Sequence, residues 1–161
     1  MAAYVGTLAT TTAVSTQPFF GLTGPVTLAT LARIVEVGMS GEAASSVVMR
    51  TQFARPTTAG TGTVTAAGNI AKIGGTNDPA ALFALSSSFA TVQWVLTTAG
   101  GSLLPFLSWN AYGGIVRWVA SLPDEEIIIT GLATLTVASQ VCFSTAVGAA
   151  AASFGIVWKE T

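Results

Sequence analysis

The sequence predicts an all-β fold, a single β-sandwich or jelly-roll domain with an extended N-terminal arm. Phe154, Ile156 and Trp158 alternate with small or polar residues, and a spacing of two also occurs within residues 45–55 and 135–143. That period is typical of strands with one face on a core. Val, Ile and Thr dominate these runs, as expected of strands. Turn residues recur between them at short intervals, which favours a sandwich or jelly roll.

The first part of the chain is expected to hold the arm and three strands. The arm is residues 1–25, extended over 4–14 and ending near Pro18, and the sandwich domain is residues 26–161. Strands are expected at 26–39, 45–54 and 63–73, with a Gly/Thr loop at 57–62 and a turn cluster at 74–79. The Gly, Asn, Asp and Pro residues of that cluster are the residues that turns require.

The second part is expected to begin with a short helical turn. Asp78 suits its N-cap and Pro79 its first position, so the turn is expected over residues 79–85. Strands are then expected at 89–98, 103–108, 114–120, 126–131, 134–145 and 151–159.

The arm contains Tyr4 and is rich in uncharged Thr and Ala. Such a segment suits strand addition to a neighbouring subunit, which makes Tyr4 a candidate subunit contact. An ordinary edge strand or a frayed tail is the alternative.

Charge is scarce along the whole chain. Lys and Arg number 6 and Asp and Glu 7, so 8% of the residues are charged, against about 25% in typical soluble domains. Either lipid or other protein subunits should therefore cover much of the surface. Ser, Thr and Gly interrupt the uncharged stretches, and the spacing of two is not that of a membrane-spanning helix. No basic residue precedes Arg33, so no signal peptide is expected, and we expect folding in the cytoplasm and no membrane partner.

Composition also excludes several chemistries. The chain has no His, and Cys142 is its one cysteine, so the usual zinc sites and Ser-His-Asp or Cys-His catalysis are not available. Six scattered cations do not form the basic stripe that nucleic acids need. We expect no catalytic residues, cofactor, metal or nucleic-acid partner.

The one charge cluster is Asp124-Glu125-Glu126, which follows Pro123. Adjacent strand residues point to opposite faces, so these carboxylates do not readily converge for acid/base chemistry. A solvated turn that blocks strand aggregation is the favoured interpretation, and contact with a basic partner is the alternative. Arg33 and Arg117 interrupt apolar strands, with Glu36 and Glu42 as possible partners.

Aromatic residues gather in the second half of the chain. They are Trp94, Trp109, Tyr112 and Trp118, and a Gly113-Gly114 pair follows Tyr112. Core packing is the favoured interpretation. A subunit interface, where Trp and Tyr are enriched, and a platform for a sugar ring are the alternatives.

Several short motifs resemble those of the head decoration, or cement, proteins of tailed bacteriophages, which are small β-sandwiches. The motifs are Trp109-Asn110 with Gly113-Gly114, then Pro123-Asp124-Glu125-Glu126, then the final aromatic strand from Ser153 to Glu160. The segment 31–55, a strand, a Ser-Gly-Glu loop and a strand ending in Arg, is similar too. The likeness covers about residue 28 to the end, and the chain departs from the pattern in its few charges and its arm.

The resemblance implies a non-enzymatic virion protein. Copies would sit on the phage head, clamp neighbouring major-capsid subunits and often form homotrimers. A carbohydrate- or receptor-binding module, or another shell or tail subunit, remains the alternative. The candidate subunit-contact residues are Tyr4, Trp94, Trp109, Tyr112, Trp118, Asp124, Glu125 and Glu126.

Overall fold

The computed structural model describes residues 1–12, 20–55, 62–64, 70–75, 78–89, 102–132, 140–147 and 150–161. Within these ranges the chain is all-β, with two six-stranded sheets. Every strand pairing between described residues is antiparallel. The all-β prediction is confirmed. None of the described residues belongs to a helix long and apolar enough to cross a membrane.

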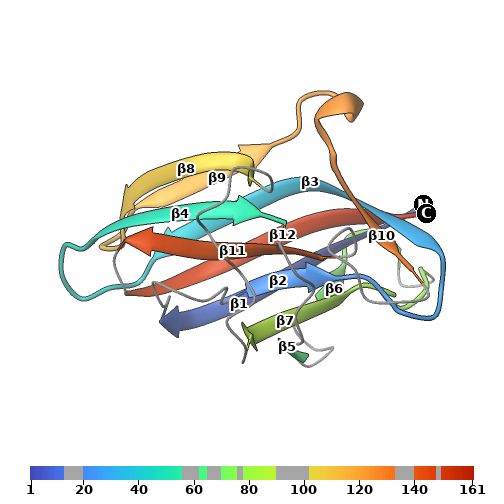
Figure 1. Cartoon of the computed structure of the whole chain (residues 1–161), viewed down its shortest axis with the longest axis horizontal. Helices are drawn as coiled ribbons and strands as arrows, with labels where there is room; N and C mark the ends of the chain where they lie inside the picture. The colour runs from blue at the N-terminus through green and yellow to red at the C-terminus, as the bar shows by residue number, and fades with distance from the viewer. Residues whose placement is uncertain are drawn as a thin grey trace.

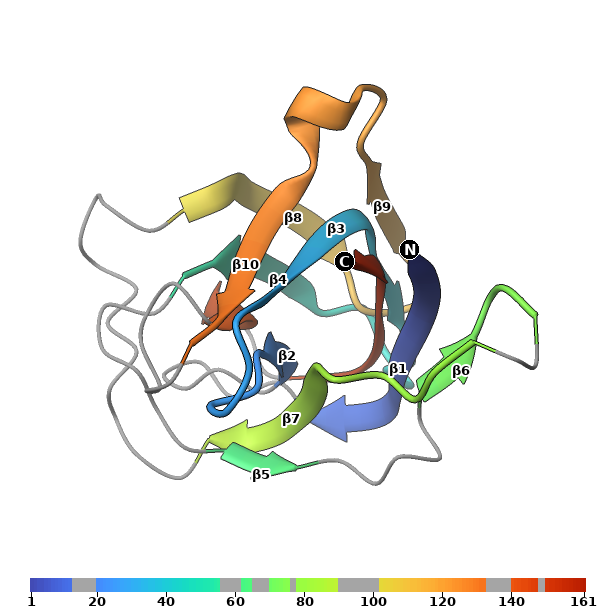
Figure 2. The ribbon, with the colours of Figure 1, turned by 90° about the vertical axis from the view of Figure 1, so that its right-hand side faces the viewer.

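The first sheet has the strand order β10-β3-β12-β1-β6, and β9 also pairs with β3. Its strands are β1 (Ala2–Thr12), β3 (Thr30–Gly41), β6 (Ile70–Lys72), β9 (Ile115–Val119), β10 (Ile127–Gly131) and β12 (Ala151–Glu160). β9 and β10 pair with successive parts of the same edge of β3. Residues 120–126 between them leave that edge as a protrusion, at the top of Figure 2.

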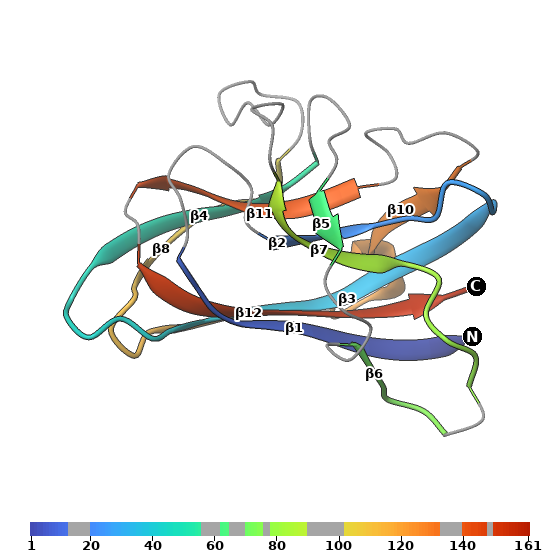
Figure 3. The ribbon, with the colours of Figure 1, turned by 90° about the horizontal axis from the view of Figure 1, so that it is seen from below.

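The second sheet has the order β5-β7-β2-β11-β4-β8. Its strands are β2 (Phe20–Thr23), β4 (Val48–Ala54), β5 (Gly62–Val64), β7 (Ala84–Phe89), β8 (Ser102–Asn110) and β11 (Gln140–Val147). The two sheets lie over one another as two layers (Figure 3). The two chain ends lie side by side (Figure 1), where Thr161 and Leu31 exchange backbone hydrogen bonds of 3.1 and 3.3 Å.

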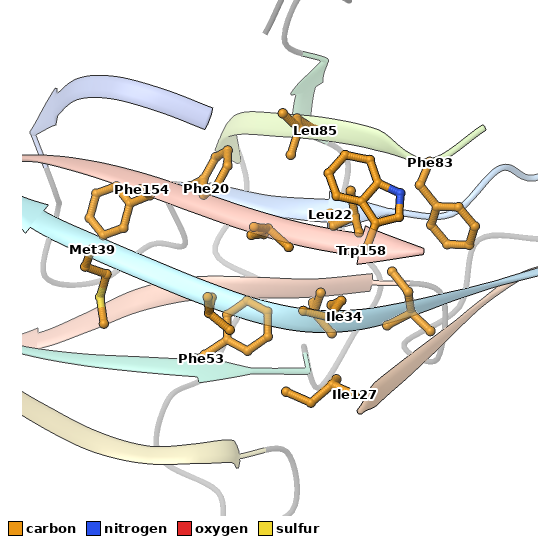
Figure 4. Close-up of a cluster of buried hydrophobic side chains, with 14 of the residues drawn as sticks. Phe20, Leu22, Ile34, Met39, Phe53, Phe83, Leu85, Ile127, Phe154 and Trp158 are labelled. Carbon is orange, nitrogen blue, oxygen red and sulfur yellow. The ribbon is translucent and has the colours of Figure 1, made fainter. Parts of the chain in front are cut away.

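The core lies between the two layers. Along β12 the buried side chains Phe154, Ile156 and Trp158 alternate with half-buried residues, as the spacing of two predicts. They meet buried residues of the second sheet, among them Phe20 and Leu85 (Figure 4). Burying one side chain of this size contributes about 1.5–3 kcal/mol, so the alternating strands explain why the two layers stay together.

The described part of the expected arm, residues 1–12 and 20–25, is not separate from the domain, because β1 and β2 are strands of the two sheets. β1 lies inside the first sheet, hydrogen-bonded to β12 on one side and to β6 on the other. The side chains of Ala2 and Tyr4 belong to the core. The reason is the same alternation that marks the other strands, which Thr-rich composition concealed: buried Ala2, Tyr4 and Gly6 alternate with more exposed neighbours.

The prediction of a helical turn at residues 79–85 is wrong. The backbone from 79 to 83 is not helical, and β7 begins at Ala84. Two physical causes are visible: the carboxylate of Glu160 binds the N–H groups of Leu82 and Phe83, and Leu85 is placed in the second sheet opposite Leu22. Tertiary contacts therefore override the local capping signal.

Other boundaries also differ. The strand expected at 26–39 begins at Thr30 and ends at Gly41. The segment expected as one strand at 63–73 supplies β5 to one sheet and β6 to the other. Of the strands expected at 89–98 and 134–145, residues 90–98 and 134–139 lie outside the described residues. The strands expected at 45–54, 103–108, 114–120, 126–131 and 151–159 are confirmed as β4, β8, β9, β10 and β12, with small shifts at their ends.

Candidate interaction surface

Tyr4 is a core residue and not a subunit contact. Its side chain is fully buried, its ring stacks on that of Trp158 with centroids 5.7 Å apart, and its hydroxyl donates to the carbonyl of Pro79 at 3.0 Å. Burial raises the pKa of the Tyr4 hydroxyl, and the nearby carboxylates of Glu160 and Asp78 raise it further. The residue joins β1 to the segment that crosses from β6 to β7.

The aromatic group predicted from the sequence divides into different environments. Trp109 is buried, and its indole Nε1 donates to Thr51 Oγ1 at 2.7 Å, so it offers no open ring to a sugar or a partner. Trp118 is half-buried and packs against the core. Trp94 lies outside the described residues. Tyr112 alone of the described members of this group is exposed, with 62% of its surface accessible.

The acidic cluster is a turn, as predicted, and each of its carboxylates has a different environment. Pro123–Glu125 is a single 3₁₀ turn. Asp124 is exposed, whereas Glu125 accepts hydrogen bonds from the N–H groups of Ser121 and Leu122 at 2.7 and 3.3 Å. Glu126 pairs with Lys159 at 3.1 Å and with Arg33 at 3.6 Å. Glu125 and Glu126 therefore hold the protrusion in shape.

The base of the protrusion coincides with an irregularity in β3. The pairing between β12 and β3 shifts register at Val157/Trp158, which leaves Val35 as an extra residue. The carbonyl of Val35 accepts a hydrogen bond from the N–H of Ala120 at 2.9 Å, at the point where the chain leaves β9. β-Bulges are frequent where an edge is redirected. The protrusion is thus fixed at its base by backbone as well as by ion pairs.

Exposed apolar side chains gather along β9 and the protrusion. Tyr112, Ile115, Val119 and Leu122 are all exposed, Ile115 to 79% and Leu122 to 61%, and we call them the apolar margin. Scattered exposed apolar residues are ordinary, but these four all fall between residues 112 and 122, with Ile115 and Val119 on one face of β9, and such local groups are candidates for an interaction site. The contact residues predicted from the sequence do not include Ile115, Val119 or Leu122. The alternation along β9 nevertheless indicates that the side chains of Ile115, Arg117 and Val119 share one face.

A groove crosses the outer face of the first sheet beside this margin. It has a volume of about 340 Å³, and its lining includes Thr7, Glu36, Ser40, Ile115 and Arg117. Its floor is formed by Gly38 and Gly155, which are paired across β3 and β12. We call this feature the glycine groove.

No contact with the described residues explains why the two floor positions are glycine. A Cβ at Gly6 would lie 2.5 Å from Leu85 Cδ1, and one at Gly41 would lie 2.1 Å from the carbonyl oxygen of Ala111, so these positions exclude larger residues. A Cβ at Gly38 meets nothing within 4 Å, and one at Gly155 meets nothing closer than 3.9 Å. Neither has the positive φ that favours glycine. Glycine inside a strand is destabilising and often marks close approach of another molecule.

An ion pair borders the groove. Arg117 Nε and Nη2 donate to Glu36 Oε1 and Oε2 at 2.6 and 2.8 Å. Hydrogen bonding from Arg117, together with its charge, holds the pKa of Glu36 below its ordinary value despite partial burial. The bonds use two of the five N–H groups of the guanidinium, and the Arg117 side chain is 62% exposed. The remaining donors are available to a second acceptor.

Comparison of the chain with protein-family models, curated proteins and solved structures found no match. Function is therefore argued from the chain's own residues. Among the described residues no three His, Cys, Asp or Glu side chains are grouped so that they could hold a metal ion.

Proposed function

We propose that this protein is a structural virion subunit, a β-sandwich decoration or cement protein that binds between major-capsid subunits and stabilises a phage head. The observation that carries the proposal is the apolar margin on a chain with 8% charged residues. A monomer in water normally keeps a mixed, charged surface. A subunit covered by neighbours does not need one.

One interface of ordinary size would cover only a small part of this chain's surface, so we expect several contacts for each copy. A standard interface buries about 800 Å² per partner, roughly a tenth of the 7730 Å² of accessible surface of this chain. A subunit seated among several capsid proteins, with further copies beside it, would cover the apolar margin and the glycine groove together. The sequence resemblance to cement proteins favours this kind of assembly over other shell or tail positions.

A carbohydrate-binding role has less support. A sugar platform needs an exposed aromatic face, and Trp109 is buried with its indole N–H bound to Thr51. Tyr112 remains exposed, but we assign it to the apolar margin because Ile115, close to it in the chain, is exposed as well.

The test is binding to heads of a phage whose genome encodes the chain. Tagged protein is mixed with purified heads and sedimented through a density gradient. We expect it to sediment with the heads in a saturable ratio and to raise the temperature at which they release DNA. Ile115→Ser together with Val119→Ser should weaken binding, and Leu28→Ser, at another exposed apolar site, is the matched control. Protein that stays at the top of the gradient at every ratio contradicts the proposal.

A further inference from the structure

We propose that the glycine groove receives the protrusion of a second copy of this chain, with Leu122 over the Gly38–Gly155 floor and Asp124 on Arg117. This inference rests on the proposed structural role and names a contact between copies within it. Three features of the described residues carry it: the shape of the protrusion, the open floor of the groove, and the charges that each presents.

The protrusion is organised before any partner binds. Glu125 binds two backbone N–H groups inside it, and Glu126 at its base lies between Lys159 and Arg33. Yet the residue that these contacts hold in place, Leu122, is 61% exposed and buries little within its own chain. A leucine presented on a rigid turn loses little conformational freedom on binding, which favours association.

The groove offers the space that such a side chain needs. A Cβ placed on Gly38 would have no atom of the described residues within 4 Å, apart from those of Gly38 and its two chain neighbours. Glycine at both cross-strand positions lets an incoming side chain reach the backbone of the sheet, as at other close approaches. The neighbouring Ile115 supplies an apolar wall, so Leu122 of a second copy would replace water on apolar surface.

The charges are complementary. The protrusion presents the exposed carboxylate of Asp124, while Arg117 at the groove keeps three N–H groups after binding Glu36. A guanidinium can take a second carboxylate on its remaining side because its donors form a planar fork. One chain thus holds both the acidic apolar protrusion and the groove that fits it. This points to a second copy as the occupant.

Each copy carries this protrusion and this groove, both beside β9. Two copies can therefore exchange the contact about a two-fold axis, or successive copies can form a ring or an open filament. In each arrangement the same residues meet, so a single set of variants tests the contact.

The experiment is analytical ultracentrifugation of the purified chain over about 1–100 µM. We expect the wild type to associate reversibly. Leu122→Ser and Gly155→Val should each raise the dissociation constant about 30-fold, the loss typical of a central interface residue. Leu28→Ser is the control and should associate like the wild type. Gly155→Val should keep its fold, because a Cβ at this position meets nothing closer than 3.9 Å and Val favours strands.

A charge exchange adds a readout that a general loss of folding does not give. Asp124→Lys and Arg117→Glu should each weaken association, and an equimolar mixture of the two variants should regain it, since each protrusion then finds a groove of opposite charge. A wild type that stays monomeric, a Leu122→Ser variant that associates normally, or a mixture that regains nothing overturns the proposal. Sedimentation with phage heads is measured in parallel and tests the proposed function separately. A variant that still binds heads but no longer self-associates has lost only the contact between copies.

Discussion

The carboxylate of Glu160 accepts a hydrogen bond of 2.9 Å from the indole N–H of Trp158, two residues earlier on the same strand. It also accepts hydrogen bonds of 2.9 and 3.1 Å from the backbone N–H groups of Leu82 and Phe83. Glu160 is buried, so these bonds replace the water that its charge has lost. The end of β12 in one sheet is thereby tied to the segment that enters β7 in the other.

Glu160→Ala should therefore lower the free energy of unfolding by about 3 kcal/mol, because two buried donors and one partly buried donor lose a charged acceptor. For a chain of this length that corresponds to a fall of roughly 6–12 °C in the melting temperature. Chemical denaturation followed by tryptophan fluorescence measures the change. Asp124→Ala, at an exposed carboxylate, is the control and should stay within about 0.5 kcal/mol of the wild type. Equal stability of the two variants would show that the Glu160 contacts contribute nothing net.

The sequence indicates the strands far better than these links between sheets. A spacing of two is a local property, so β4, β9, β10 and β12 are visible in the sequence itself. From the sequence, Glu160 would be expected to lie in solvent, because it is a charged residue next to the last position. Nothing near it in the chain shows that Leu82 and Phe83 will lie beside it. Tyr4 was misassigned for the same reason: only the pairing of β1 with β12 shows that its ring meets Trp158.

The candidate site follows the same rule. The acidic turn is visible in the sequence because it stands beside a proline. The exposure of Tyr112 is not visible, since core packing is the favoured interpretation of its aromatic group. The glycine groove is not visible, because Gly38 and Gly155 meet only when β3 and β12 pair. Core packing, the favoured interpretation of the aromatic group, holds for Trp109, which is buried. Its hydrogen bond to Thr51 is not visible in the sequence because Thr51 comes from another strand.

The bond between Trp109 and Thr51 can be tested by a double-mutant cycle. Trp109→Phe leaves the buried hydroxyl of Thr51 without its donor, and Thr51→Val leaves the indole without its acceptor, so each should cost about 1–3 kcal/mol. The double variant should be less unstable than the sum of the two, with a coupling of about 1 kcal/mol. Additive losses in chemical denaturation would mean that the 2.7 Å bond stabilises nothing.

Two glycines of β3 should respond in opposite directions to the same change. Gly41→Ala should destabilise the fold by about 1–3 kcal/mol, since its Cβ would lie 2.1 Å from the backbone oxygen of Ala111. Gly38→Ala should stabilise the isolated chain by about 0.5–1 kcal/mol, because the added methyl meets open space. Thermal unfolding at low protein concentration measures both. A destabilised Gly38→Ala variant would reveal an internal role for that glycine.

The pair of Glu36 and Arg117 should make stability depend on pH in a defined range. The folded state lowers the pKa of Glu36, chiefly through hydrogen bonding from Arg117, so the unfolded state binds the proton more readily. The pair's contribution is therefore complete above the ordinary pKa of a glutamate, about 4.3, and is lost as the pH falls through the lower folded value. The difference in unfolding free energy between wild type and Glu36→Gln should be constant from about pH 6 to 8 and shrink toward pH 3.

Because the Arg117 side chain is well exposed, about 0.15 M salt should already weaken the effect. Leu28→Ser, which changes no charged group, serves as the control. A wild-type advantage over Glu36→Gln that persists unchanged at pH 3 would show that hydrogen bonding to Arg117 does not favour the charged form of Glu36.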